Sequence, residues 1–171
     1  MLLGRQQEII DNIPLSLLKD PEEKSKLTIL HGLSYRQLNQ PDKAKSLFEQ
    51  ALVLDGNNYR ATLGLALLAA DNNDYEAAYS NIESVLRQDP DNINALSQKA
   101  DLLGKQGKTA ESLKVMNRIL DLKPETVRSR IGRARNYIFM KDREKAAVDI
   151  NWLMEKYPQL PVTAYLKGSL L

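Results

Sequence analysis

The fold is decided by residues 89–124, which read DPDNINALSQKADLLGKQGKTAESLKVMNRILDLKP. Pro90 and Pro124 bound two helical patterns, which are separated by the turn-forming residues 106–108. Because proline cannot continue a helix and glycine favours turns, we expect two helices that fold back on each other. The stretch therefore predicts one helix–turn–helix unit.

The same unit recurs along the chain without insertion or deletion. The interval from Pro90 to Pro124 is repeated between Pro124 and Pro158, and one interval before Pro90 stands Gly56, another residue that ends helices. Two columns at this period are small, namely Gly32/Ala66/Ala100/Ala134/Gly168 and Ala44/Ala78/Ser112/Ala146, and three are mostly bulky and apolar, namely Phe48/Ile82/Met116/Ile150, Ala51/Val85/Ile119/Leu153 and Leu52/Leu86/Leu120/Met154. Antiparallel helices approach closely where side chains are small, so we expect the small columns to mark helix contacts and the bulky columns to fill the space between helices.

This period divides the chain into four full repeats at residues 25–58, 59–92, 93–126 and 127–160. Residues 1–24 are expected to form an irregular helical pair or a partial repeat, and residues 161–171 match only the first helix of a fifth repeat. Helical arrays usually end in a polar cap, whereas Tyr165, Leu166 and Leu170 are apolar. We expect a piece cut from a longer array, with a single capping helix as the alternative.

Over residues 25–171 these columns resemble the tetratricopeptide repeat family, in which one repeat takes the same interval as that from Pro90 to Pro124. The resemblance implies an all-α, right-handed superhelix, or α-solenoid, of antiparallel helix pairs whose first helices line a concave groove. Two columns depart from the family pattern: Thr28/Thr62/Leu96/Arg130 replace an early aromatic residue, and His31/Leu65/Lys99/Arg133 replace an early leucine. We expect these departures to change packing details while leaving the fold intact.

Three short strings resemble, more narrowly, the tetratricopeptide lipoproteins of the PEP-CTERM/exosortase system. They are IPLS at residues 13–16, YRQLNQPDKA at residues 35–44 and AYLKG at residues 164–168. This resemblance implies a bacterial envelope protein, periplasmic or anchored to the outer membrane, that serves exopolysaccharide production and protein sorting. The chain would then be an internal part of such a lipoprotein, and its lipidated cysteine would lie outside this sequence. The cytoplasm stays open as the alternative compartment.

Composition argues against several kinds of chemistry. The chain has no cysteine and one histidine, His31, which excludes thiolate and multi-histidine metal sites. The 24 basic and 22 acidic residues are interspersed, and acidic neighbours dilute the basic fourth repeat, which disfavours nucleic-acid binding. The longest apolar run, residues 65–70, is too short to span a membrane. We therefore expect no cofactor, no metal, no nucleic-acid partner and no membrane insertion by this segment.

Two features that could suggest catalysis have simpler explanations. The triplet Gly107-Lys108-Thr109 resembles the end of a phosphate-binding loop, but Leu102 stands where that loop needs a glycine, and no strand precedes it. No sequence signature places a nucleophile or an orienting carboxylate beside His31. The sequence therefore predicts a protein without a catalytic site.

The candidate binding site is the inner face of the first helices. Near the start of these helices stands the column Lys26/Arg60/Asn94/Arg128, and the same face adds Leu33, Arg36, Leu63, Leu67, Gln98, Asp101, Lys105, Ile131, Arg135 and Phe139. Gly64 and Gly132 on this face could admit a ligand backbone closely. We predict a groove for an extended or helical peptide, in which Arg60, Arg128 and Arg135 contact carboxylates or polar backbone groups. A solvated basic stripe is the alternative.

The predicted function is a non-catalytic scaffold that binds a protein or peptide partner. The alternatives are a regulatory or targeting array attached to an enzyme and a cytosolic adaptor. Leu33, Gly64 and Leu67 stand where chaperone-binding members of the family carry a carboxylate clamp, which disfavours a chaperone-tail adaptor.

Overall fold

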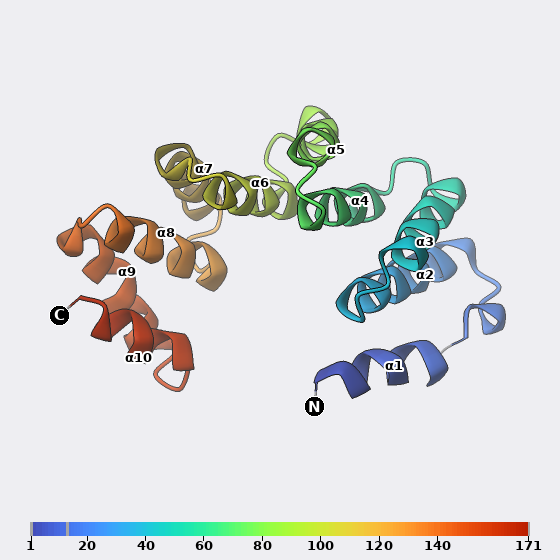
Figure 1. Cartoon of the computed structure of the whole chain (residues 1–171), viewed down its shortest axis with the longest axis horizontal. Coiled ribbons are helices and arrows are strands. Elements are labelled where there is room, and N and C mark those ends of the chain that lie inside the picture. The colour runs from blue at the N-terminus through green and yellow to red at the C-terminus, as the bar shows by residue number, and fades with distance from the viewer. Residues whose placement is uncertain (1, 13, 171) are drawn as a thin grey trace. The chain divides into compact units, whose positions relative to one another are not determined.

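The structure is a computed structural model that describes residues 2–12 and 14–170 (Figure 1). Residues 1, 13 and 171, which belong to the predicted end segments and to one of the family-like strings, lie outside the described part. The described elements are α1 (Leu2–Asn12), the 3₁₀ helix η1 (Leu15–Leu17), α2 (Pro21–Gln37), α3 (Pro41–Leu54), α4 (Tyr59–Asp71), α5 (Tyr75–Gln88), α6 (Ile93–Lys105), α7 (Thr109–Leu122), α8 (Val127–Phe139), α9 (Arg143–Lys156) and α10 (Pro161–Gly168). Every regular element in this part of the chain is helical.

Helices that follow each other in the sequence pack as pairs. The pairs are α2 with α3, α4 with α5, α6 with α7, and α8 with α9, whereas α1 packs on α2 and α10 packs on α9 and α8. The chain divides into two compact units, Met1–Pro90 and Asp91–Leu171, here called the first and the second unit. The prediction of an all-α fold built from tetratricopeptide-like helix pairs is confirmed.

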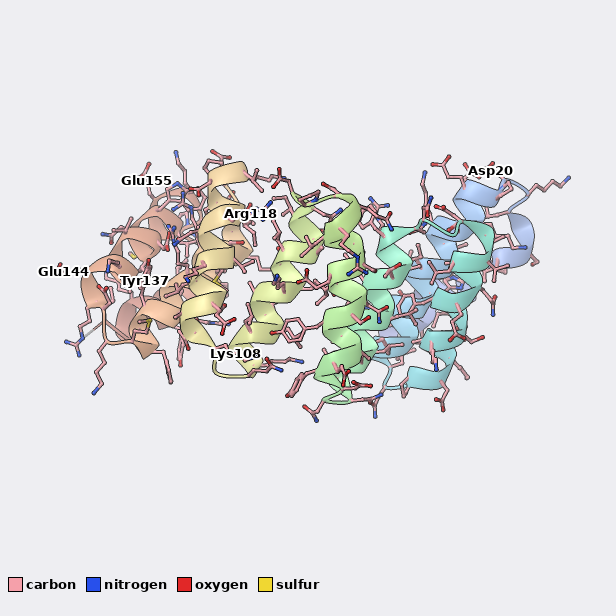
Figure 2. All side chains as sticks on the ribbon, turned by 90° about the horizontal axis from the view of Figure 1, so that it is seen from above. Asp20, Lys108, Arg118, Tyr137, Glu144 and Glu155 are labelled. Carbon is pink, nitrogen blue, oxygen red and sulfur yellow. The ribbon has the colours of Figure 1, made fainter. Side chains whose placement is uncertain are left out.

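Side-chain caps start several of these helices. The carboxylates of Asp74 and Asp142 and the amide oxygen of Asn92 each accept a backbone N–H three residues further on, at 3.0–3.1 Å. Asp20, labelled in Figure 2, caps α2 in the same way by accepting from Glu23 N at 2.9 Å. Because of this cap and Pro21, α2 begins four residues before the predicted start of the first repeat at residue 25.

The turn inside each helix pair uses one left-handed residue at the same place in the period. Asn39, Asn73, Gly107 and Lys141 follow one another at the repeat interval and have φ values of 57°, 59°, 73° and 61°. A left-handed conformation is easy for glycine, tolerable for asparagine and unfavourable for lysine. Lys141, in the second unit, is therefore the residue of this column that least favours the left-handed conformation.

The core follows the predicted columns. In the first unit, Ala44, Phe48 and Ala51 of α3 are completely buried and pack with Ile29 of α2 and Ala61 of α4. In the second unit, Ala134 of α8, Ile150 of α9 and Leu166 of α10 are likewise completely buried in one cluster. In these two clusters, the buried side chains of α3 pack with α2 and α4, and those of α9 pack with α8 and α10.

Gly168 departs from its small-residue column. Ala66, Ala100 and Ala134 are at most 2% exposed, whereas Gly168 is exposed and no atom lies within 4 Å of the place where its Cβ would stand. Among the described residues, α10 packs on α8 and α9 and has no second helix of its own repeat to cover this glycine.

Candidate functional site

A pocket lies beside the first helices of each unit. In the first unit a pocket of about 450 Å³ lies where α2 and α4 begin, beside the connection that follows α3. In the second unit a pocket of about 810 Å³ lies between α6 and α8. These are called the first-unit pocket and the second-unit pocket.

The first-unit pocket brings together two members of the predicted basic column, Lys26 and Arg60. Lys26 Nζ lies 2.6 Å from Glu22 Oε1, and this hydrogen bond raises the pKa of Lys26 above its ordinary value. Arg60 Nε donates to Tyr59 Oη at 3.2 Å, and its guanidinium carbon lies 5.6 Å from the centre of the tyrosine ring. The carboxylates of Glu22 and Asp55 line the same pocket, so its two cations face two anions.

The second-unit pocket combines an apolar floor with a charged rim. Met116, Ile131 and Gly132 contribute to the floor, and the rim holds Asp101, Lys105, Arg128 and Arg135. Arg128 Nη2 donates to Asp101 Oδ2, which joins the start of α8 to α6. The rim therefore carries three cations and one carboxylate.

A chain of side-chain hydrogen bonds holds one wall of this pocket in place. Asn136 Nδ2 donates to Ser112 Oγ at 3.1 Å, and Ser112 Oγ donates to the Ala100 carbonyl oxygen at 2.8 Å. These two hydrogen bonds join α6, α7 and α8 beneath the pocket, and they satisfy the hydroxyl group of Ser112, which is completely buried.

The other predicted site residues are more scattered. Arg36 Nε lies 2.5 Å from Asp71 Oδ2 and links α2 to α4, and Leu33 is half-buried against the first-unit core. Leu67 and Gln98 are also half-buried, whereas Asn94 and Phe139 are exposed. Neither pocket is lined by these six residues.

Two expectations for the inner face are wrong. Leu63 is only 3% exposed, so it is a core residue that a partner cannot reach. Gly64 does not admit a ligand backbone, because the Phe48 ring fills the space beside it: a Cβ at Gly64 would lie 2.5 Å from Phe48 Cε1. Gly132 lines the second-unit pocket, but Met116 occupies the space next to it in the same way, with Cε 2.5 Å from the Cβ position. In both cases the bulky side chain comes from the preceding repeat.

The sequence analysis missed a buried ionic cluster in the second unit. Asp149 of α9 is completely buried and accepts from Arg133 Nε and Nη2 at 2.7 and 2.8 Å, and from Arg130 Nη1 at 2.9 Å. The hydrogen bond to Asp149 raises the pKa of Arg133 above its ordinary value. Arg133 Nη1 also donates to Asn117 Oδ1 at 2.8 Å. The signal was present in the fourth repeat, where Arg130 and Arg133 replace an aromatic residue and a leucine.

This cluster also accounts for two of the basic residues of the fourth repeat. Besides its bond to Asp149, Arg130 lies over the Trp152 ring, with the guanidinium carbon 4.1 Å from the ring centre, and donates to the Pro124 carbonyl oxygen at 3.0 Å. Two of the four arginines of α8 therefore hold α8 against α9. Only Arg128 and Arg135 belong to the pocket rim.

Consecutive helix pairs with small contact residues and recurring left-handed turns define a helical-repeat protein. Two models described as tetratricopeptide repeat match residues 29–93 and 69–130. Together they span residues 29–130, which is more than half of the chain. The chain belongs to the tetratricopeptide repeat family.

Solved structures agree with this fold. PilF of Pseudomonas aeruginosa has a TM-score of 0.78 at 22% identity, over 88% of this chain and 69% of that one. YrrB, described as a tetratricopeptide protein with an unusual peptide-binding site, has a TM-score of 0.66 at 17% identity, over 98% and 87%. PilW, described as a widely conserved type IV pilus biogenesis factor, has a TM-score of 0.71 at 18% identity, over 81% and 64%. At these identities the similarity establishes the fold.

A search of curated protein sequences found no significant match. Within residues 2–12 and 14–170, no helix has both the length and the apolar character that crossing a bilayer requires. The same residues contain no group of three or more histidine, cysteine or acidic side chains placed to hold a metal ion.

Proposed function

We propose that this protein is a non-catalytic scaffold that binds a protein or peptide partner on the face of its first helices. The observation that carries the proposal is the second-unit pocket of about 810 Å³, which has the size of a ligand-binding site and joins an apolar floor to a charged rim. The similarity to YrrB, whose description names a peptide-binding site, supports the same class of ligand.

The proposed contact residues fall into two groups. Lys26 and Arg60 would act in the first-unit pocket, and Asp101, Arg128 and Arg135 in the second-unit pocket. Leu33, Arg36, Leu67, Asn94, Gln98 and Phe139 remain proposed contacts on the same helices, and Leu63 is removed from the set because it is buried.

Affinity capture with the immobilised chain tests this function. A partner captured from an extract of the source organism should be lost when Arg128 and Arg135 are both changed to alanine. Arg118→Ala is a matched control, because Arg118 of α7 is also an exposed arginine paired with an aspartate, Asp91 at 2.7 Å, and it does not line the pocket (Figure 2). Capture that survives the double variant would exclude the second-unit pocket as the binding site.

We further propose that the chain belongs to an envelope lipoprotein of the PEP-CTERM/exosortase type. Its support is the set of strings at residues 13–16, 35–44 and 164–168, together with the similarity to PilW, which is described as a type IV pilus biogenesis factor. An antibody raised against the chain should detect a membrane-associated, lipidated protein in fractionated cells. Recovery of the protein solely in the cytosolic fraction would contradict this assignment.

A further inference from the structure

The two pockets differ in charge. The first-unit pocket is balanced, with Lys26 and Arg60 facing Glu22 and Asp55. The second-unit pocket carries Lys105, Arg128 and Arg135 against the single carboxylate of Asp101. A site with an excess of two positive charges attracts anionic groups and repels cationic ones.

We propose that the second-unit pocket binds an extended acidic peptide segment with one apolar residue between two carboxylates, and that Asp101 holds Arg128 while the pocket is empty. This inference rests on the proposed peptide-binding function and names the chemistry of the ligand. The ligand's two carboxylates contact Arg128 and Arg135, and its apolar side chain packs on Ile131.

The spacing along α8 supports this ligand pattern. Arg128, Ile131 and Arg135 all line the pocket and are separated by three and then four residues, which places them on one face of the helix. Arg128 and Arg135 are therefore separated by about 10 Å along the helix axis. An extended peptide presents alternate side chains on one face about 7 Å apart, so the side chains of its residues i and i+4 start about 14 Å apart. The arginine side chains are long enough to span the difference of about 4 Å, so residues i, i+2 and i+4 can meet Arg128, Ile131 and Arg135 in turn.

Asp101 acts as an internal substitute for one ligand carboxylate. Its bond to Arg128 lies at the protein surface, where the side chains of Asp101 and Arg128 are 41% and 70% exposed. Exposed ion pairs of this kind contribute little net free energy, because water and salt screen them. A ligand carboxylate can therefore replace Asp101, and Asp101 lowers the affinity for acidic segments by competing for the same guanidinium.

The test uses the full chain and three fluorescent peptides that share a glycine–serine frame. The first has the pattern glutamate–serine–leucine–serine–glutamate, and its twins replace both glutamates by glutamine or by lysine. Fluorescence anisotropy should show the glutamate peptide binding about tenfold or more tightly than either twin, since each charge-assisted hydrogen bond is stronger than a neutral one.

Single variants then separate the roles of the rim residues. Arg135→Ala should weaken the glutamate peptide about tenfold, whereas Asp101→Asn should tighten it about threefold by releasing Arg128. Neither change should alter binding of the glutamine twin. Arg118→Ala and Asp91→Asn are the matched controls, since these two residues form an exposed pair outside the pocket. The unmodified chain and these four variants should all have the same thermal unfolding midpoint.

Three results would overturn the proposal. Equal affinity for the glutamate and glutamine peptides would show that charge does not select the ligand. Tighter binding of the lysine twin, lost in Asp101→Asn, would show that the pocket prefers cations; peptide binding as such would then stand. If none of the three peptides binds at millimolar concentration, the acidic ligand is excluded, and the capture experiment decides the scaffold function separately.

Discussion

The two units use different side chains at the repeat junction, the place where a bulky side chain of a second helix packs against small residues of the first helices on either side. In the first unit the Phe48 ring lies between Gly32 and Gly64, and a Cβ at either glycine would stand within 2.7 Å of it. In the second unit the equivalent side chain is Met116, with Ala100 sixteen residues before it and Gly132 sixteen residues after it. A rigid ring needs two glycines, whereas a flexible thioether leaves room for one alanine.

The units also differ in what holds them besides apolar contact. The second unit encloses Asp149 with Arg130 and Arg133, while Arg36 and Asp71, which join α2 to α4 in the first unit, keep 27% and 39% of their side chains exposed. A fully buried carboxylate depends on its partners far more than a half-exposed one does. The first unit is therefore held together mainly by close apolar packing, and the second unit adds a buried network of ionic hydrogen bonds.

Removing the ring should give the largest effect. Phe48→Ala deletes a completely buried side chain that touches two helices, and we expect a loss of about 3–5 kcal/mol in unfolding free energy. Met116→Ala removes fewer atoms from a site that relaxes more easily, so a loss of about 2–3 kcal/mol is expected. Urea denaturation of the full chain measures both. An equal loss in the two variants would remove the distinction between the junctions.

Breaking the ionic cluster should come next. Asp149→Ala leaves the mostly buried guanidinium groups of Arg130 and Arg133 without their carboxylate, and we expect a loss of about 3 kcal/mol. Changing Arg133 to leucine in the same protein should recover part of this loss, because it removes one of the stranded charges. Glu155→Ala, which removes an exposed carboxylate 3.6 Å from Lys156, is the control and should change stability by less than about 0.5 kcal/mol.

Adding one methyl group tests the rigidity of each junction directly. Gly64→Ala forces a Cβ against the Phe48 ring, which Gly32 confines from the other side, and should cost about 1–3 kcal/mol. Gly132→Ala meets the terminal methyl group and the sulfur of Met116, the flexible end of that side chain, which can rotate away, and should cost less than about 1 kcal/mol. Phe48→Leu should restore part of the stability lost in Gly64→Ala. If Gly132→Ala proves the more damaging change, the ring is not the stiffer element.

The turns provide the smallest test. The first unit places Asn39 and Asn73 at its left-handed turn positions, whereas the second unit places Gly107 and Lys141 there. Lys141→Asn makes the second unit resemble the first and should add about 0.5 kcal/mol of stability. Gly107→Ala should remove about 1 kcal/mol, because alanine disfavours a φ of 73°. Thermal unfolding midpoints should move in opposite directions in the two variants.

Sequence reasoning recovered the fold because its evidence is periodic. Columns such as Phe48/Ile82/Met116/Ile150 repeat at one interval, and the structure buries all four. The inner face was less predictable. Leu63 was placed there from its position in the repeat, but its column does not separate core from groove, because Ile29 is 5% exposed whereas Ile131 is half-buried and lines the second-unit pocket.

Contacts between individual side chains of different helices were harder still to foresee. The partner of Gly64 is Phe48, sixteen residues earlier. The period shows which positions are equivalent in successive repeats, but it does not show which positions sixteen residues apart are in contact. The pairing of Arg133 with Asp149 has the same separation and joins α8 to α9. Asp101, Arg128 and Arg135, which the sequence assigned to one face, line the same pocket, yet the bond between Asp101 and Arg128 depends on side-chain geometry that the period does not contain.

The sixteen-residue contact also limits how this array can be rearranged by recombination. Phe48 belongs to the first repeat, but the glycine that accommodates it belongs to the second. Deleting residues 59–92 would leave the helical period intact and place Gln98, which occupies the position of Gly64, next to Phe48. The unit that can be exchanged without steric conflict is therefore a second helix together with the first helix that follows it, and its boundaries fall inside the repeats that the sequence period defines.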